Sequence, residues 1–209
     1  MAPVSSEVHG VEASASVGKS ALRLVLASAS PRRRELIERL GLTPDAIAAA
    51  DIDETPAARE VPRDYARRMA REKALAVAID DAFVLAGDTV VSCGRRILPK
   101  AEDEATARAC LTLLSGRRHR VFSAITLRAP DGTLRERLSE TIVRFKPLSH
   151  EEMEAYIAGG EWDGKAGGYA IQGSAEGLIA WISGTHSGVI GLPLFETRAL
   201  LKSAGFAIA

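Results

Sequence analysis

A short apolar run, Leu22 to Ala27, constrains the fold of this chain more than any other segment. Arg23 is its one charged residue, and the rest of the run is typical of a strand buried on both faces. A helix is predicted to follow at once, because Ser30 can cap it, Pro31 suits its first turn and Gly41 ends it. A buried strand that passes directly into a helix is the first unit of an α/β arrangement.

The rest of the sequence alternates helices and strands early and gathers strands in its middle. Further helices are predicted from Arg63 to Ile79, from an Asp103 cap to Leu114, from a Ser149–Glu152 capping box to Ala158, and from Pro193 to the residue before Gly205. Further strands are predicted over Ala46–Ala50, Phe83–Val91, Val121–Leu127, Leu134–Phe145 and Leu178–Ile182, whereas Gly159–Gly173 has no helical or strand period. The pattern indicates an α/β fold with a mixed sheet and flanking helices, and argues against a fully parallel barrel.

The length of 209 residues suits a single domain, which we place at residues 21–209. Residues 1–20 are rich in Ser, Ala and Gly and lack the features of a signal peptide, so we expect a flexible tail. No apolar run approaches the ~18 residues that a membrane helix needs, and no membrane partner is expected. Cys93 and Cys110 have neither metal nor disulfide spacing, which suits a cytoplasmic protein with reduced thiols.

The charged residues balance, with 27 basic and 27 acidic side chains. A net charge of zero and an aromatic fraction of 5% speak against a nucleic-acid-binding module, which would need basic and stacking surfaces. Any affinity for phosphate must therefore come from local clusters of cations.

The segment from Ser28 to Arg34 is one such cluster. Where a strand turns into a helix, the free N–H groups and the positive end of the helix dipole form an anion site. Ser28 and Ser30 add hydroxyl donors, and the three arginines from Arg32 to Arg34 oppose the dipole at a cost of roughly 0.3–1 kcal/mol each. These misplaced charges favour a phosphate site over the alternative, a capped helix with a solvated basic face. The segment is not a Walker loop.

Two charged side chains fall where the apolar pattern predicts burial. Lys73 lies within the apolar stripe of the helix Arg63–Ile79, so it either snorkels outward or points into a cleft that supplies an anion. Asp88 interrupts the apolar run Phe83–Val91 and, unless it only caps a turn, a buried carboxylate needs a cation, a metal or strong donors. Glu54, in an acidic segment, is a second candidate carboxylate, with a solvated loop as the alternative.

A pair of carboxylates beside a triphosphate would hold Mg²⁺ or Mn²⁺ through oxygen atoms, with water in the remaining positions. Asp88 and Glu54 are the candidate ligands. Zinc is not expected, because the histidines are scattered and form no cluster with cysteine.

Five short segments stand in a fixed order along the chain. They are Ser28-Ala-Ser-Pro-Arg-Arg, Ala70-Arg-Glu-Lys-Ala, Gly87-Asp-Thr-Val-Val, Lys165-Ala-Gly-Gly-Tyr-Ala-Ile-Gln-Gly and Gly191-Leu-Pro-Leu. Each is weak alone, but the five in register, over about Leu22 to Leu201, resemble the Maf family.

The resemblance implies a divalent-metal-dependent pyrophosphatase that converts a nucleoside triphosphate to the monophosphate and pyrophosphate. It also implies an inosine-triphosphatase-like (Maf/Ham1) fold, two lobes around a cleft, and a homodimer. By position, Ser28, Arg33 and Lys73 would hold phosphates, Asp88 would bind the metal or act as general base, and Glu54 would assist with the metal. Lys100 and Gln172 would complete the pocket.

Within the family, Arg32 and the segment Gly168–Gly173 resemble the branch that acts on dTTP and UTP. Gln172 offers an amide donor and an acceptor, which suit a pyrimidine edge. Modified pyrimidine nucleotides are further candidate substrates. The sequence departs from the family at Leu98-Pro99-Lys100-Ala101, where both neighbours of the lysine differ. The placement of Lys100 and the catalytic acid expected at position 99 are therefore open.

A non-catalytic nucleotide-binding regulator of cell division is the alternative function, because the resembled family has also been linked to septum formation. The carboxylates beside phosphate-binding cations favour the enzyme, since a pure binder has little need for them.

Overall fold

A seven-stranded mixed sheet runs through the structure, which is a computed structural model and describes residues 22–208. Its strands are Leu24–Ala27 (β1), Ala46–Ile47 (β2), Phe83–Cys93 (β3), Arg96–Leu98 (β4), Arg118–Arg128 (β6), Leu134–Phe145 (β7) and Ile179–Ser183 (β9). Their order is β2-β1-β3-β6-β7-β9, with β4 paired to β3. β1 is parallel to β2 and β3, whereas the other pairs are antiparallel. The predicted mixed sheet is confirmed.

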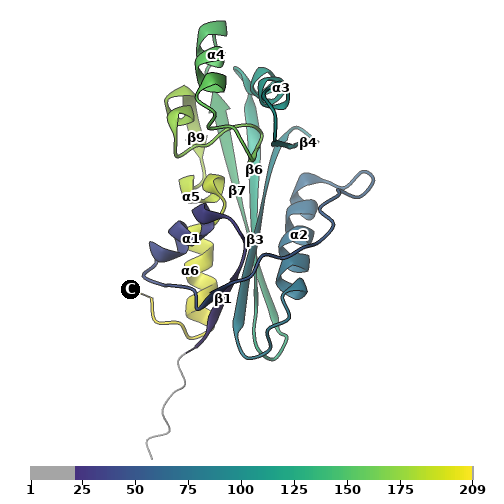
Figure 1. The fold of residues 1–209 in the computed structure, drawn as a ribbon, viewed down its shortest axis with the longest axis vertical. Coiled ribbons are helices and arrows are strands. Elements are labelled where there is room, and N and C mark those ends of the chain that lie inside the picture. The colour runs from purple at the N-terminus through teal and green to yellow at the C-terminus, as the bar shows by residue number, and fades with distance from the viewer. Residues whose placement is uncertain (1–21, 209) are drawn as a thin grey trace, which may run out of the picture.

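Helices cover both faces of this sheet (Figure 1). They are Pro31–Glu38 (α1), Pro62–Ala76 (α2), Glu104–Leu114 (α3), His150–Ala158 (α4), His186–Ile190 (α5) and Leu194–Ser203 (α6), with a 3₁₀ turn at Ser174–Leu178 (η1). Figure 1 shows α1 and α6 on one side of the sheet, α2 on the other, and α3 and α4 at one end of the molecule. Among the described residues, no helix is long and apolar enough to cross a membrane.

The strand β1 is buried on both faces, as predicted. Leu24 and Leu26 join the core under α1 and α6, whereas Val25 and Ala27 join the core against α2. Successive side chains of a strand point to opposite faces, so an unbroken apolar run fits only between two layers of helices.

The long strands β3, β6 and β7 extend beyond the end of β1. β1 pairs with β3 only over Phe83–Ala86, whereas β6 follows β3 as far as Ser92. Around that point and beyond it, α3 and α4 pack on a further core that contains Phe145. The loop that leaves β1 at Ser28 therefore emerges between two groups of elements. The carboxyl end of a parallel strand is where α/β sheets most often bind ligands.

A second, two-stranded sheet pairs Lys100–Ala101 (β5) with Lys165–Ala166 (β8). Neither strand was predicted, because each has two residues and no local period. β4, η1 and α5 were not predicted either, because each has only three to five residues.

Several predicted boundaries were wrong. The second strand stops at Ile47 rather than Ala50, and the helix predicted to reach Ile79 ends at Ala76. Ser30 holds the N-cap position of α1, but its side chain accepts no capping hydrogen bond. The capping predicted for Asp103 and for the Ser149–Glu152 box is confirmed.

The predicted tail, residues 1–20, lies outside the described residues, and the domain boundary at residue 21 stays a prediction. Both cysteines are free thiols. Cys110 is buried in α3, and Cys93 is half-buried at the end of β3.

We expect Leu111→Ala to lower the free energy of unfolding by about 2–5 kcal/mol, because Leu111 is fully buried in the core beneath α3 and truncation leaves a cavity. Thr112→Ala, an exposed change on the same helix, is the control and should stay within ~0.5 kcal/mol. Urea denaturation measures both variants, and similar losses in the two would contradict the packing assigned to α3.

Candidate active site

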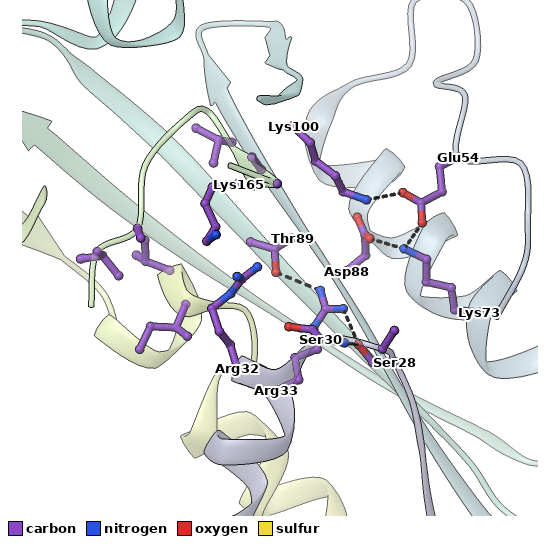
Figure 2. Close-up of a pocket in the computed structure, with 18 of the residues that line it drawn as sticks. Ser28, Ser30, Arg32, Arg33, Glu54, Lys73, Asp88, Thr89, Lys100 and Lys165 are labelled. Atoms are coloured by element: carbon purple, nitrogen blue, oxygen red, sulfur yellow. Dashed lines mark hydrogen bonds and ion pairs between the residues drawn. The ribbon is translucent and has the colours of Figure 1, made fainter. Parts of the chain in front are cut away.

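A pocket of about 300 Å³ opens where β1 ends (Figure 2). Its walls come from segments far apart in the sequence. They contain every residue predicted for the site: Ser28, Arg32, Arg33, Glu54, Lys73, Asp88, Lys100 and Gln172. The structure thus brings the predicted residues together, and their roles remain predictions.

The loop after β1 holds Arg33 at the floor of the pocket. Ser28 Oγ accepts a hydrogen bond from the Ser30 N–H at 3.2 Å and another from Arg33 Nη1 at 3.1 Å. Arg33 also donates from Nε to the Gly191 carbonyl at 2.9 Å and from Nη2 to Thr89 Oγ1 at 3.4 Å. Burial lowers the pKa of Arg33, and the nearby Asp88 opposes that shift. The guanidinium remains a cation, fixed in orientation by three neighbours.

Gly191 can approach Arg33 because it has no side chain. Its φ is 131°, a conformation that residues with a Cβ rarely adopt. A Cβ there would lie 3.3 Å from Thr89 Oγ1 and 3.7 Å from Arg33 Nε. The motif Gly191-Leu-Pro-Leu therefore contributes backbone, rather than a side chain, to the site.

Lys73 lies between two carboxylates. Its Nζ is 2.7 Å from Asp88 Oδ1 and 2.7 Å from Glu54 Oε1, and Lys100 Nζ is 2.9 Å from Glu54 Oε2. Both Lys73 and Asp88 are 7% exposed. Lys73 therefore faces the cleft, and the alternative in which it snorkels outward is wrong.

The pKa of Glu54 is lowered to about 2. Burial alone would raise it, but the hydrogen bonds and charges of Lys73 and Lys100 outweigh burial. Burial, together with the charges of Asp88 and Glu54, raises the pKa of Tyr65 to about 12. Glu54 is therefore ionised at neutral pH.

Side chains of α2 hold the segment that carries Glu54. The Tyr65 hydroxyl donates to the Glu54 carbonyl at 2.5 Å, and Arg68 Nη2 donates to the Thr55 carbonyl at 3.0 Å. Arg68 also pairs with Glu60 at 2.8 Å. The helix α2 thus supplies Lys73 and also positions Glu54, with which Lys73 forms an ion pair.

The β5–β8 pair places Lys100 and Lys165 at one edge of the pocket. Lys100 pairs with Ala166 across the two strands, and the Gly167 N–H donates to the Pro99 carbonyl at 2.9 Å. The altered neighbours of Lys100 therefore leave it in the pocket. Proline has no carboxylate, so the acid that the resemblance led us to expect at position 99 is absent.

Gly167 joins this edge to the sheet. It has a φ of 71°, and a Cβ on it would lie 2.8 Å from Val91 Cγ1. Only glycine lets the turn after β8 rest directly on β3.

Thr89 and Lys165 also line the pocket, and neither was assigned a role from the sequence. Thr89 contacts Arg33, and Lys165 faces Arg32 (Figure 2). The alternation along β3 would have placed Thr89 opposite Asp88. Lys165 is the first residue of a motif quoted above, and the pairing of β5 with β8 places it beside the pocket. Arg34, by contrast, is exposed, pairs with Glu38 and does not line the pocket.

The carboxylates fit a divalent cation. Glu54 and Asp88 already converge on one positive charge, the Lys73 ammonium. No group of three or more His, Cys, Asp or Glu side chains suited to a metal occurs in residues 22–208. Two carboxylates with water and phosphate oxygens are a donor set typical of Mg²⁺.

Residues 23–204 match the sequence model of a family described as Maf-like protein. A dTTP/UTP pyrophosphatase of Novosphingobium aromaticivorans is 71% identical over 184 residues, covering 87% of this chain and 92% of the relative. Proteins of the same description from Rhodospirillum rubrum and Paramagnetospirillum magneticum are 62% and 61% identical, covering 88% of this chain and 88% and 98% of the relatives.

Among solved structures, the Ham1 protein of Staphylococcus aureus aligns with 59% of this chain and 71% of its own, at a TM-score of 0.42 and 18% identity.

We expect the Glu54 carboxyl to stay ionised well below its ordinary pKa of 4.5, down to about 2. Its ion pairs therefore stabilise the fold fully above pH 4.5 and lose that effect as the pH falls through about 2. Lys100→Gln should raise the midpoint, because it removes one of the two cations. Lys202→Gln, an exposed change outside the pocket, should not. Carboxyl ¹³C NMR from pH 6 to below pH 2 measures the titration of Glu54, and a midpoint near 4.5 in the unaltered protein would contradict the geometry.

Proposed function

The chain belongs to the Maf family, and on this premise we propose that it is a nucleoside triphosphate pyrophosphatase that hydrolyses dTTP and UTP to the monophosphate and pyrophosphate. The names of the relatives from three organisms support the substrates.

One observation in the structure carries the proposal: a buried carboxylate, Asp88, lies within a pocket otherwise rich in cations. Cations alone would bind phosphate. A carboxylate beside them repels phosphate oxygens, so its presence is useful when it accepts a proton or holds a metal.

Asp88 is the proposed general base. Lys73 binds its Oδ1, and its second oxygen accepts no hydrogen bond from any residue that the structure describes. A water held by that oxygen would lose its proton to Asp88 and attack the α-phosphorus. The bond from the α-phosphorus to the bridging oxygen then breaks, and the electron pair leaves with pyrophosphate.

Asp88 and Glu54 would hold Mg²⁺ or Mn²⁺, whose charge would draw electron density from the phosphate oxygens. Ser28, Arg32 and Arg33 lie where they can bind the phosphates. Lys73 and Lys100 add positive charge that opposes the negative charge formed in the transition state.

Gln172 is the proposed reader of the base. It is exposed and lines the pocket next to the buried Ile171. A primary amide matches the adjacent donor and acceptor of uracil and thymine. Modified pyrimidine nucleotides that keep this edge are included in the proposal.

We also propose that the protein is a cytoplasmic homodimer. The free thiols suit a reducing compartment. Phe195 is 78% exposed, and the edge strand β9 exposes Trp181 and Ile182, which are apolar side chains of the kind that interfaces cover. Light scattering at micromolar concentration should give twice the chain mass of 22.2 kDa, and a mass equal to one chain would contradict the dimer.

We expect Asp88→Asn to reduce pyrophosphate release from dTTP and UTP by about 10²- to 10³-fold, because the amide cannot accept the proton and binds metal poorly. Single-turnover assays with Mg²⁺ or Mn²⁺, over a panel of nucleoside triphosphates, measure the change.

Asp80→Asn is the matched control, since Asp80 is exposed and outside the pocket. Near-normal turnover by Asp88→Asn would remove Asp88 from the reaction. Metal-dependent binding with no product from any nucleotide would instead support the non-catalytic regulator.

A further inference from the structure

We infer that His119 is a positioning residue for nucleotide binding: through the Tyr169 hydroxyl it fixes the segment that presents Gln172 to the base. This inference deepens the proposed function and rests on the role that the proposal gives to Gln172. His119 lies on β6 and does not line the pocket, and the reaction described above does not use it.

The segment 169–172 lines the pocket but belongs to no helix or strand. A ladder of backbone hydrogen bonds therefore does not set its position, and side chains from other elements hold it instead. The Tyr169 hydroxyl is 2.8 Å from His119 Nε2, and the Ala170 N–H donates to the Tyr156 hydroxyl of α4 at 3.0 Å. Two buried hydroxyl contacts thus tie the segment to β6 and to α4.

Three aromatic rings fix the direction of the contact with His119. Phe145 of β7 stacks on the imidazole, with ring centroids 5.8 Å apart. The Tyr169 ring is nearly perpendicular to both, with its centroid 5.4 Å from that of His119 and 5.1 Å from that of Phe145. All three side chains are buried. The imidazole is therefore held in place, and water does not compete with it for the hydroxyl.

Stability alone does not account for this polar pair. His119 Nδ1 is buried and has no hydrogen-bond partner among residues 22–208, and an unmade hydrogen bond opposes folding. Two apolar side chains of similar shape would stabilise the same core about equally well. The pair does supply direction, because the hydroxyl must meet Nε2 and the Tyr169 ring is then restricted to one position.

The contact persists at neutral pH. Burial lowers the pKa of His119 to about 4, so the imidazole is neutral. Burial raises the pKa of Tyr169, which keeps the hydroxyl protonated. A neutral imidazole has one donor and one acceptor nitrogen, and a hydroxyl can pair with either. Nε2 therefore bonds the hydroxyl in both tautomers.

Gln172 follows Tyr169 by three residues. The Gly173 N–H donates to the Ala170 carbonyl at 3.0 Å, which closes a turn that contains Ile171 and Gln172. Ile171 is buried in the core, whereas Gln172 is exposed to the pocket. A shift of the Tyr169 ring would therefore move the Gln172 amide relative to the base. The carboxylates and the cations of α2 and of the loop after β1 would keep their positions.

The test compares dTMP with pyrophosphate in calorimetric titrations without divalent metal, so that turnover is not involved. His119→Leu should weaken dTMP binding about 5- to 10-fold, as expected for loss of one buried hydrogen bond, and change pyrophosphate binding by less than about twofold. In assays with dTTP and Mg²⁺, KM should rise by a similar factor while kcat stays nearly unchanged. His119→Gln, whose amide can again pair with the hydroxyl, should restore most of the dTMP affinity. His150→Leu, the same change at an exposed histidine, is the control.

A double variant separates positioning from stability. Tyr169→Phe removes the same hydrogen bond from its other end and should weaken dTMP binding to a similar extent. Combining Tyr169→Phe with His119→Leu leaves two apolar partners, so the melting temperature should recover toward that of the unaltered protein while dTMP binding stays weak. A merely structural role predicts that the affinity recovers together with the melting temperature.

Unchanged dTMP binding in the two single variants would overturn the inference. Recovery of dTMP affinity in the double variant, an equal loss of pyrophosphate binding, or no dTMP binding by the unaltered protein would also overturn it. If His119→Leu does not fold, Tyr169→Phe and His119→Gln still decide the question. Failure of the proposed function is separate: the unaltered protein would release no pyrophosphate from any nucleotide, whatever the titrations show.

Discussion

The Lys73 ammonium between Asp88 and Glu54 is the interaction on which the rest of the structure depends. Removing an ion from water costs several kcal/mol, so the two buried charges, Lys73 and Asp88, are tolerated only because they contact each other closely, with the half-buried Glu54 beside them. That contact requires α2 to lie close to β3. The face of α2 toward the sheet provides this through small side chains, since Ala66, Ala70 and Ala74 are fully buried. The close packing of α2 on β3 is therefore also what brings Lys73 into contact with Asp88.

The pocket lies where β3 extends beyond the end of its neighbour β1. β1 pairs with β3 only as far as Ala86, whereas β3 continues to Cys93, and Arg33 of the helix after β1 contacts Thr89 on that further part of β3. Arg33 closes this junction through Ser28, Thr89 and the Gly191 carbonyl, so three distant segments meet at one guanidinium. Because β3 alternates its side chains, Asp88 faces α2 while Thr89 faces Arg33. One strand thus separates the acidic side of the pocket from the purely cationic side.

The sequence predicted what local patterns determine. The two-faced burial of β1, the long strands and the capped helices follow from periods and capping residues. Asp88 and Lys73 were found because each breaks an apolar pattern, and the cost of burying a charge indicates that a partner must exist. The sequence could not show that they are each other's partners, which is a tertiary contact. Lys165 opens one of the five motifs, but its place in the pocket depends on a two-residue pairing between segments over sixty positions apart, which no local pattern predicts. Serine is a residue type typical of N-caps, yet the Ser30 side chain makes no capping hydrogen bond and instead lines the pocket.

The glycine turn after β8 has a consequence for how sequence changes affect this protein. Gly167 packs directly against Val91. A Cβ on the neighbouring Gly168 would lie only 3.2 Å from the Cα of Ala107 in α3, so there is no space for a side chain there. The strand that carries Lys165 is thus seated on the hydrophobic core without any flexible spacer. A change in side-chain volume at Val91 or Ala107 would be transmitted along this rigid connection to the lysine. Substitutions in the hydrophobic core would then alter the affinity for phosphate. Sequence changes in the core and in the ligand site are therefore coupled.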